Sequence, residues 1–475
     1  MTSVLRLLLL VLSCCSCIAH GGDEHEHYTV LETRSLEPKS VCSGLKVIPS
    51  ANGSWVPLHR PYGPCSPAQS TAAPSLLDML RWDQLRTGYI RRKVSGAGED
   101  VLQPTTPEVD VQQSNYSPQA DVGAGSGAGA AAAGSSGTLS DLDPTAMGNG
   151  IVTQTVVIDT SSDVPWIQCL PCPVPPCHPQ KNQFFNPTRS TTYAAVPCGS
   201  PACKALGQYG NGCSNSQCQY TVVYGDGTAT TGTYITDTLT LNPTTRIMNF
   251  RFGCSHSVRG YFSDQTAGTM GLGGGSQSLL SQTAGLFGNA FAYCIPPPSS
   301  SGFLLLGGPT VAPWHFARTP LIRNSRAPTF YLVRLEAIIV AGQRLNVPPA
   351  VFSAGSVMDS SAIVTQLPPT AYRALRSAFR YAMRMYPLTA PRGNLDTCYD
   401  FIRFTTVRVP EVSLVFERGA ALDLEPPAVM MDGCLAFAAT PSDSSVGFIG
   451  NVQQQTYEVL YDVGGRSVGF RRGAC

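Results

Sequence analysis

The sequence predicts an all-β protein made of two lobes, and three observations point to this fold class. A chain of 475 residues with 43% apolar content is long enough to form two separate cores. From about Ser140 onward, short runs of β-branched and aromatic residues alternate with Gly, Pro, Asn and Ser. A stretch of apolar residues, an aspartate and hydroxyl residues occurs once in each half, at 156–163 and 357–362. We therefore expect two β lobes, residues 140–319 and 320–475, with a central cleft between them.

Residues 1–19 have the pattern of a secretory signal peptide, with one Arg, a Leu-rich run and small residues up to Ala19. No later stretch reaches about 18 consecutive apolar residues, so we expect no transmembrane segment. The 12 cysteines from Cys169 onward are an even number, which suits an oxidising compartment. The sequence therefore predicts a secreted or extracellular protein with six disulfides in this part of the chain.

Residues 20–139 differ in composition from the β-rich part. A helical pattern at 75–93 carries most of the basic residues, and the segment ends at 123–137 in a run of only Gly, Ala and Ser. Such a run is typical of a flexible linker. Taken by itself, the remainder of the segment is consistent with a disordered, merely solvated stretch. The net charge of the whole chain is +1, which indicates no nucleic-acid partner.

Asp159 and Asp359 are the candidate catalytic residues. Asp159 is followed by Thr-Ser-Ser and Asp359 by Ser-Ser-Ala. One such stretch is common where a strand runs into a turn, because Asp and Ser side chains cap the backbone. Two carboxylates, one from each half, can share a proton so that one acts as an acid and the other as a base. We expect this chemistry to need no cofactor and no metal.

The order and spacing of several motifs resemble the pepsin-like aspartic proteases, in the plant branch that includes the nepenthesins. That family normally has Gly at the third position of each Asp loop, where this chain has Ser161 and Ser361. The resemblance implies a bilobal pepsin-like fold and a secreted aspartic-type endopeptidase that hydrolyses peptide bonds with a water activated by two Asp residues. The alternative is a catalytically impaired homologue that acts as a binding or inhibitor-like protein. The matching stretches are 159–169, 224–227, 270–273, 358–372 and 448–451.

The resemblance also assigns supporting roles around the two aspartates. Ala362 stands where the family has a hydroxyl donor, which would make Asp359 harder to ionise. The expected supporting residues are Thr160 and Ser360 beneath the pair, Ser162 as a donor to Asp159, Tyr224 at the tip of a mobile hairpin, and Trp166 as the partner of that tyrosine.

Residues 20–139 correspond by resemblance to an inhibitory propeptide and linker, so the chain would be a zymogen. Its basic residues would pair with the active carboxylates until acid protonates them; they are Arg81, Arg86, Arg91, Arg92 and Lys93. The resemblance further implies a monomer with protein or peptide substrates, located in the apoplast or vacuole. It implies a disulfide between Cys398 and Cys434, and a disulfide-stapled insertion at 169–218. Because residues 146–151 replace the usual first strand of the mature enzyme, we expect a truncated first hairpin.

Overall fold

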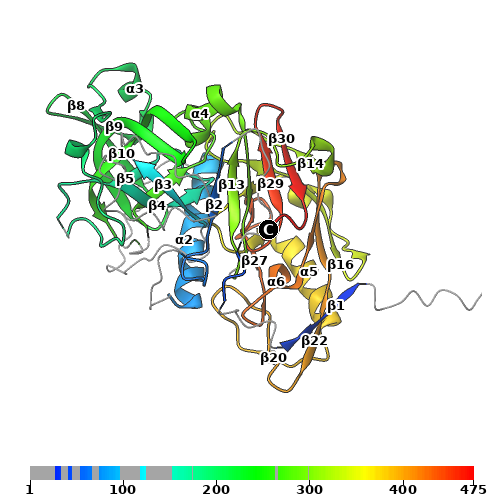
Figure 1. The fold of residues 1–475 in the computed structure, drawn as a ribbon. Helices are drawn as coiled ribbons and strands as arrows, with labels where there is room; N and C mark the ends of the chain where they lie inside the picture. Colours follow the sequence, from blue (N-terminus) through cyan, green and yellow to red (C-terminus); the bar gives the residue numbers. More distant parts are fainter. Residues whose placement is uncertain are drawn as a thin grey trace, which may run out of the picture.

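The computed structural model describes residues 27–33, 41–44, 54–66, 74–96, 118–124, 152–173, 175–260, 262, 266–297 and 299–475. The predicted signal peptide and most of the predicted linker lie outside these residues. The described chain is rich in β-strands, and the helix α2 (Leu76–Ser95) stands between strands of the first and second halves (Figure 1). None of the described helices combines the length and apolar character needed to cross a membrane.

The N-terminal lobe is built on a nine-stranded sheet. Its strand order places the strand that ends at Asp159 next to the centre, where buried residues cover it on both faces. The order is β10 (Thr245–Arg259), β5 (Trp166–Gln168), β11 (Gly268–Gly271), β4 (Val152–Asp159), β3 (Gln119–Ala124), β9 (Ala229–Asn242), β8 (Gln217–Val223) and β7 (Gly210–Ser214), with β6 (Ala194–Ala195) also paired to β9.

The C-terminal lobe repeats this plan on a smaller scale. A five-stranded sheet runs in the order β15 (Leu332–Val333), β18 (Ser356–Met358), β28 (Gly447–Ile449), β19 (Thr365–Leu367), β27 (Phe437–Ala439). The lobe also contains two four-stranded sheets. The first has the order β17 (Gln343–Arg344), β16 (Leu335–Val340), β23 (Val412–Phe416), β24 (Ala421–Leu424). The second has the order β20 (Leu388–Thr389), β21 (Cys398–Tyr399), β26 (Cys434–Leu435), β25 (Met430–Met431). The helices of the two lobes are α3 (Pro201–Lys204), α4 (Leu279–Phe287), α5 (Pro369–Ala382) and α6 (Pro426–Val429). The helix α5 begins directly after Pro368.

A six-stranded sheet joins the two lobes. It mixes strands from both halves of the chain, in the order β14 (Ala317–Pro320), β30 (Ser467–Arg471), β29 (Glu458–Asp462), β12 (Ala290–Cys294), β13 (Gly302–Leu306), β2 (Ser54–Leu58). The boundary expected at 319/320 falls inside β14, so the lobes share this sheet.

The first strand of the N-terminal lobe is present and paired with β4, so the expectation that this strand pair is truncated was wrong. Strand β3 pairs antiparallel with β4 over six residues, from Gln119 opposite Val157 to Ala124 opposite Val152. It lies within residues 20–139, upstream of the expected start of the lobe at Ser140. Gly123 and Ala124 were assigned to the linker because they are small, yet small residues pack well in a strand whose six residues are all buried.

Three further elements from residues 20–139 are part of the fold. Strand β1 (Tyr28–Glu32) pairs with β22 (Thr406–Pro410) of the C-terminal lobe, and β2 forms the edge of the joining sheet. Helix α2 (Leu76–Ser95) begins at Ser75, whose side chain accepts a hydrogen bond from the backbone of Asp78. The described parts of this segment are therefore packed against the lobes rather than merely solvated.

All the cysteines that the structure describes are paired, in seven disulfides. Six of these involve the 12 cysteines from Cys169 onward, and one of the six is the expected Cys398–Cys434 bond, so both predictions are confirmed. Cys169 and Cys172 have different partners and do not act as a Cys-x-x-Cys pair. The pairs are Cys42–Cys65, Cys169–Cys254, Cys172–Cys177, Cys198–Cys213, Cys203–Cys218, Cys294–Cys475 and Cys398–Cys434.

Candidate active site

Two similar strand arrangements carry the two aspartates. In the first, β11 runs parallel to β4 and places Gly271 opposite Asp159. In the second, β28 runs parallel to β18 and places Ile449 opposite Met358, the residue before Asp359. The glycines that end these crossing strands are required by close approach. A Cβ on Gly271 would lie 2.6 Å from the carbonyl oxygen of Ser162, and one on Gly450 would lie 2.5 Å from the carbonyl carbon of Val364.

Thr160 and Ser360 bind each other's loops reciprocally beneath the pair. The backbone N–H of Thr160 donates to Ser360 Oγ at 3.1 Å, and the backbone N–H of Ser360 donates to Thr160 Oγ1 at 3.0 Å. Each hydroxyl then donates across to the other lobe, Thr160 to the Met358 carbonyl at 3.3 Å and Ser360 to the Ile158 carbonyl at 3.1 Å. Because both residues are fully buried, the two loops are held in one relative position.

The donors around the two carboxylates differ from those expected. Asp159 Oδ1 accepts a bond from the Ser161 backbone at 2.9 Å, whereas Asp359 Oδ1 accepts bonds from the backbones of Ser361 at 2.8 Å and Ala362 at 3.1 Å. The Ser161 hydroxyl donates to Asp359 Oδ2 at 3.1 Å. Among the described residues, the donors to Asp159 do not include the hydroxyl of Ser162, which we had expected there.

The two serines that replace glycine do not strain the backbone. Neither Ser161 nor Ser361 has a positive φ, so the loops do not need the left-handed conformation that favours Gly. Their hydroxyls differ, because that of Ser161 binds Asp359 while that of Ser361 is buried without a hydrogen-bond partner among the described residues.

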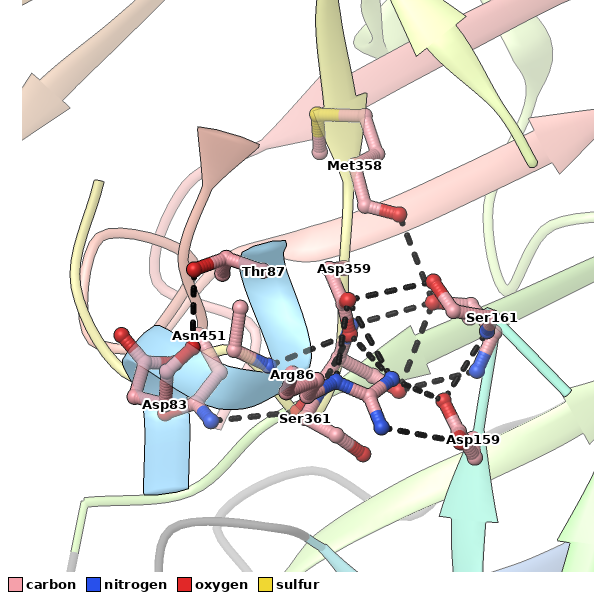
Figure 2. Close-up of polar contacts among 12 residues, drawn as sticks. Asp83, Arg86, Thr87, Asp159, Ser161, Met358, Asp359, Ser361 and Asn451 are labelled. Carbon is pink, nitrogen blue, oxygen red and sulfur yellow. Dashed lines mark hydrogen bonds and ion pairs between the residues drawn. The ribbon is translucent and has the colours of Figure 1, made fainter. Parts of the chain in front are cut away.

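Arg86 of α2 lies between the two carboxylates (Figure 2). Its Nη2 atom is 2.7 Å from Asp159 Oδ1 and 3.0 Å from Asp359 Oδ1, so one nitrogen bridges both groups. Its Nε and Nη1 atoms donate to the second oxygens of the same carboxylates. Burial alone would lower the pKa of Arg86, but the charges of Asp159 and Asp359 raise that pKa above its ordinary value. Of the five basic residues that we expected to pair with the carboxylates, Arg86 is therefore the one that contacts both of them.

Further polar contacts hold α2 against the C-terminal lobe. Asp83 accepts a bond from the backbone of Ile363 at 2.7 Å and another from Gln366 Nε2 at 3.3 Å. Burial of Asp83 raises its pKa to about 7. Arg91 donates to the Val446 carbonyl at 3.1 Å and to Gln366 Oε1. Sequence reasoning missed Asp83, although it stands three residues before Arg86 and so shares its helix face.

The apolar residues of α2 pack on either side of Arg86. Met79, Leu80 and Trp82 join a buried cluster around the Cys398–Cys434 bond. Ile90 and Val94 join a second cluster with residues of the C-terminal lobe that include Phe330 and Phe448. The helix therefore packs on the C-terminal lobe over several turns rather than touching it at one point.

The hairpin of β8 and β9 covers the site from the N-terminal lobe. At its tip, the backbone N–H of Tyr224 donates to the Thr228 carbonyl at 2.8 Å. Trp166 Nε1 donates to the Tyr224 hydroxyl at 2.6 Å, so the structure brings these two expected residues together. The tip also rests on α2, because a Cβ on Gly225 would lie 2.4 Å from Cβ of Tyr89.

Asp163 connects the first aspartate loop to the disulfide-stapled insertion. Its carboxylate accepts bonds from Thr329 Oγ1 at 2.6 Å, the Gly275 backbone at 2.9 Å and the Tyr209 hydroxyl at 3.2 Å. Tyr209 comes from a single turn, Gly207–Tyr209, between the cysteines of the insertion. Both residues line a pocket beside Arg86. Sequence reasoning missed them, although Asp163 ends the first aspartate motif.

A buried arginine upstream of α2 reaches the second aspartate loop from below. Arg60 Nη1 donates to Asn451 Oδ1 at 3.1 Å, and Asn451 Nδ2 donates to the Ser360 carbonyl at 3.1 Å. Residues 54–66 are thus linked to the site through Asn451 as well as through the joining sheet.

Comparisons with known proteins agree with this geometry. Family models described as xylanase inhibitor N-terminal and xylanase inhibitor C-terminal match residues 144–308 and 330–472. An aspartyl protease family protein of Arabidopsis thaliana is 35% identical over 99% of each chain. Nepenthesin-2, an aspartic proteinase of Nepenthes gracilis, is 34% identical over 70% of this chain and 76% of its own.

Among solved structures, the basic 7S globulin from soybean superposes with a TM-score of 0.55 and 19% identity, over 75% of this chain and 90% of that one. At this identity the likeness shows the fold alone. The curated relatives, which include proteins named as aspartic proteinases, support aspartic-type endopeptidase activity. With the paired strand arrangements and the two facing aspartates, they show that the chain belongs to the pepsin-like aspartic protease family, in its nepenthesin-type plant branch.

Proposed function

We propose that Asp159 and Asp359 are the catalytic pair of this aspartic-type endopeptidase, acting on protein or peptide substrates. The observation that carries the proposal is that a single nitrogen of Arg86 contacts both carboxylates. Two carboxylates this close do not both ionise readily, so they share a proton. The ionised group takes a proton from a water molecule, while the protonated group donates to the carbonyl oxygen of the peptide.

We further propose that the chain described is the inhibited precursor. Arg86 occupies the position between the carboxylates that the reacting water needs. The rest of α2 packs on the C-terminal lobe and against the tip of the β8–β9 hairpin. The signal peptide would be residues 1–19, and the propeptide would start at residue 20. Since β3 belongs to the N-terminal sheet, the removable part would end before Gln119. The seven disulfides support a secreted or vacuolar location. We also propose that the protein is a monomer.

The competing function, an impaired homologue that only binds a partner, rested on Ser161 and Ser361. It loses much of its basis because neither serine has the strained backbone that would displace its aspartate. The reciprocal Thr160 and Ser360 bonds and the Trp166–Tyr224 contact further support an enzyme.

Hydrolysis of an unfolded protein by the purified chain, measured from pH 3 to pH 8, tests the proposed function. We expect cleavage in acid that is lost in both Asp159→Asn and Asp359→Asn. Asp443→Asn, which changes an exposed carboxylate on the C-terminal lobe, is the matched control and should cleave as the parent does. Cleavage that survives in either catalytic-site variant would contradict the proposal.

A further inference from the structure

We propose that the Ser161 hydroxyl supplies, from the opposite lobe, the donor that the second loop lacks at Ala362. By doing so it places the negative charge of the pair on Asp359, so that Asp359 is the general base and Asp159 the general acid. This inference rests on the proposed function, because it assigns the roles within the same pair.

The number of donors on each carboxylate differs once α2 has left. Asp359 keeps the backbone N–H groups of Ser361 and Ala362 on Oδ1 and the Ser161 hydroxyl on Oδ2. Among the described residues, Asp159 keeps only the backbone N–H of Ser161, because its other donors are nitrogens of Arg86. Hydrogen bonds donated to a carboxylate favour its charged form. The charge of the pair therefore belongs on Asp359.

The other titratable groups that face Asp359 do not reverse this assignment. Arg86 and Asp83 lie on α2 and leave with it. Tyr293 on β12 and Tyr461 on β29 face Asp359 from below, and burial raises the pKa of both hydroxyls, so they stay neutral in acid. In the open site Asp159 is then the titratable group that shares the proton of the pair with Asp359.

The hydroxyl contact is specific to Ser161. Ser361 occupies the equivalent position in the other loop, yet its Oγ is buried and has no partner among the described residues. The two replacements of glycine are therefore not equivalent. Only the one in the first loop reaches across the lobes, and it reaches the aspartate whose own loop has lost a donor to Ala362.

The assignment gives each proton a defined route. The water oxygen bonds to the peptide carbonyl carbon as its proton moves to Asp359, and the proton of Asp159 moves to the carbonyl oxygen. The tetrahedral diol then breaks its C–N bond, with the proton of Asp359 moving to the leaving nitrogen. One hydroxyl proton of the diol returns to Asp159, so both carboxyl groups regain their starting states.

The pH profile of kcat/KM on a peptide substrate tests the proposal, using enzyme processed in acid. The acid limb is the part of the profile in which kcat/KM rises with pH as the general base ionises. Ser161→Ala removes the hydroxyl and should move this limb to higher pH by about half a unit to one unit. On that limb, kcat/KM should then be roughly three- to tenfold lower at a given pH. Ser161→Thr keeps a hydroxyl and should restore the limb. Ser444→Ala, which removes an exposed hydroxyl on the C-terminal lobe, should leave the limb in place. The inference is overturned if Ser161→Ala leaves the limb where the parent has it, or if Ser444→Ala moves it equally.

A neutron structure separates failure of this inference from failure of the proposed function. Crystals of the full-length chain carrying Arg86→Ala, grown in D₂O in mild acid, show directly which carboxyl holds the deuteron. We expect it on Asp159. A deuteron on Asp359 refutes the inference even if the enzyme is active. Absence of aspartate-dependent cleavage refutes the proposed function instead, and the position of the deuteron still decides the charge assignment.

Discussion

The guanidinium of Arg86 lies 2.7 Å from Asp159, the closest of its contacts with the two aspartates. The two residues are 73 positions apart in the chain, and the arginine belongs to a helix upstream of β3. Of the basic residues that we expected to pair with the aspartates, Arg86 forms this ion pair. Protonation of the aspartates would weaken it.

Replacing Arg86 by Ala should make the precursor easier to activate. Loss of one partner from a buried ion pair costs on the order of 3–5 kcal/mol, and here it would be taken from the docking of α2. We therefore expect processing to begin at higher pH than in the parent, as measured by gel analysis after incubation across a pH series. Arg81→Ala is the matched control, because Arg81 is exposed on the same helix. If processing of Arg86→Ala begins at the same pH as in the parent, the ion pair of Arg86 does not hold α2 in place.

Asp83 should stabilise the docking of α2 in acid, whereas protonation of Asp159 and Asp359 in acid should weaken the ion pair with Arg86. Burial raises its pKa to about 7 from an ordinary value of 3.8, so its protonated form is favoured when the helix is docked. Its stabilising contribution is full below about pH 4 and is lost as the pH rises through 7, at up to about 1.4 kcal/mol per pH unit between these values. The thermal stability of the precursor should therefore increase from pH 8 to pH 5.5.

Asp83→Asn checks this sign, because the amide is neutral throughout. We expect the variant to be more stable than the parent at pH 8 and to show a flatter dependence of Tm on pH. Asp78→Asn, which changes an exposed carboxylate in the first turn of α2, should keep the parental slope. Equal slopes in Asp83→Asn and the parent would show that Asp83 does not titrate in this range.

Ser360→Ala should destabilise the protein, whereas Ser361→Ala should not. The first change leaves the buried backbone N–H of Thr160 without its side-chain acceptor and removes the bond to the Ile158 carbonyl. An unsatisfied buried group costs about 1–3 kcal/mol. The neighbouring hydroxyl of Ser361 has no partner to lose among the described residues. Denaturant unfolding should show a lower free energy of unfolding for Ser360→Ala than for Ser361→Ala. Equal losses of stability would contradict a stabilising role for the reciprocal hydrogen bonds between Thr160 and Ser360.

The bond between Trp166 and Tyr224 should matter for catalysis more than for stability. Tyr224→Phe removes the hydroxyl that accepts the indole N–H at 2.6 Å, which loosens the tip of the hairpin over the site. We expect kcat/KM to fall by roughly fivefold, the effect of about 1 kcal/mol. Tyr381→Phe is the control, because that ring is 71% exposed. A parental kcat/KM in Tyr224→Phe would argue that the hairpin is positioned by its backbone alone.

Local patterns were sufficient to predict the parts of the site that the chain encodes close together. The strands ending at the two aspartates and the hairpin tip at Tyr224 both lie in short, recognisable stretches. Helix α2 was equally visible from its pattern, but its partner was not. That Arg86, rather than its four basic neighbours, reaches the carboxylates depends on how the helix is rotated in the cleft.

Contacts over long sequence separations explain the remaining errors. The last two residues of β3, Gly123 and Ala124, were read as part of a linker because such small residues become strand-like only when paired with β4. The bond from Ser161 to Asp359 spans 198 positions, so no local pattern could distinguish a compensating donor from a damaging substitution. Asp163 and Tyr209 meet through a disulfide-stapled insertion whose pairings the sequence left open.

Self-processing of the purified precursor in acid tests the central claim most directly, that Asp159 and Asp359 hydrolyse peptide bonds once α2 leaves the cleft. Mass spectrometry should show a product that has lost α2 and retains β3 after incubation in acid, together with new hydrolysis of an added unfolded protein. The Asp159→Asn precursor should remain intact under the same conditions. If the Asp159→Asn chain processes itself as the parent does, or if the processed parent hydrolyses no substrate at any pH, the account is wrong.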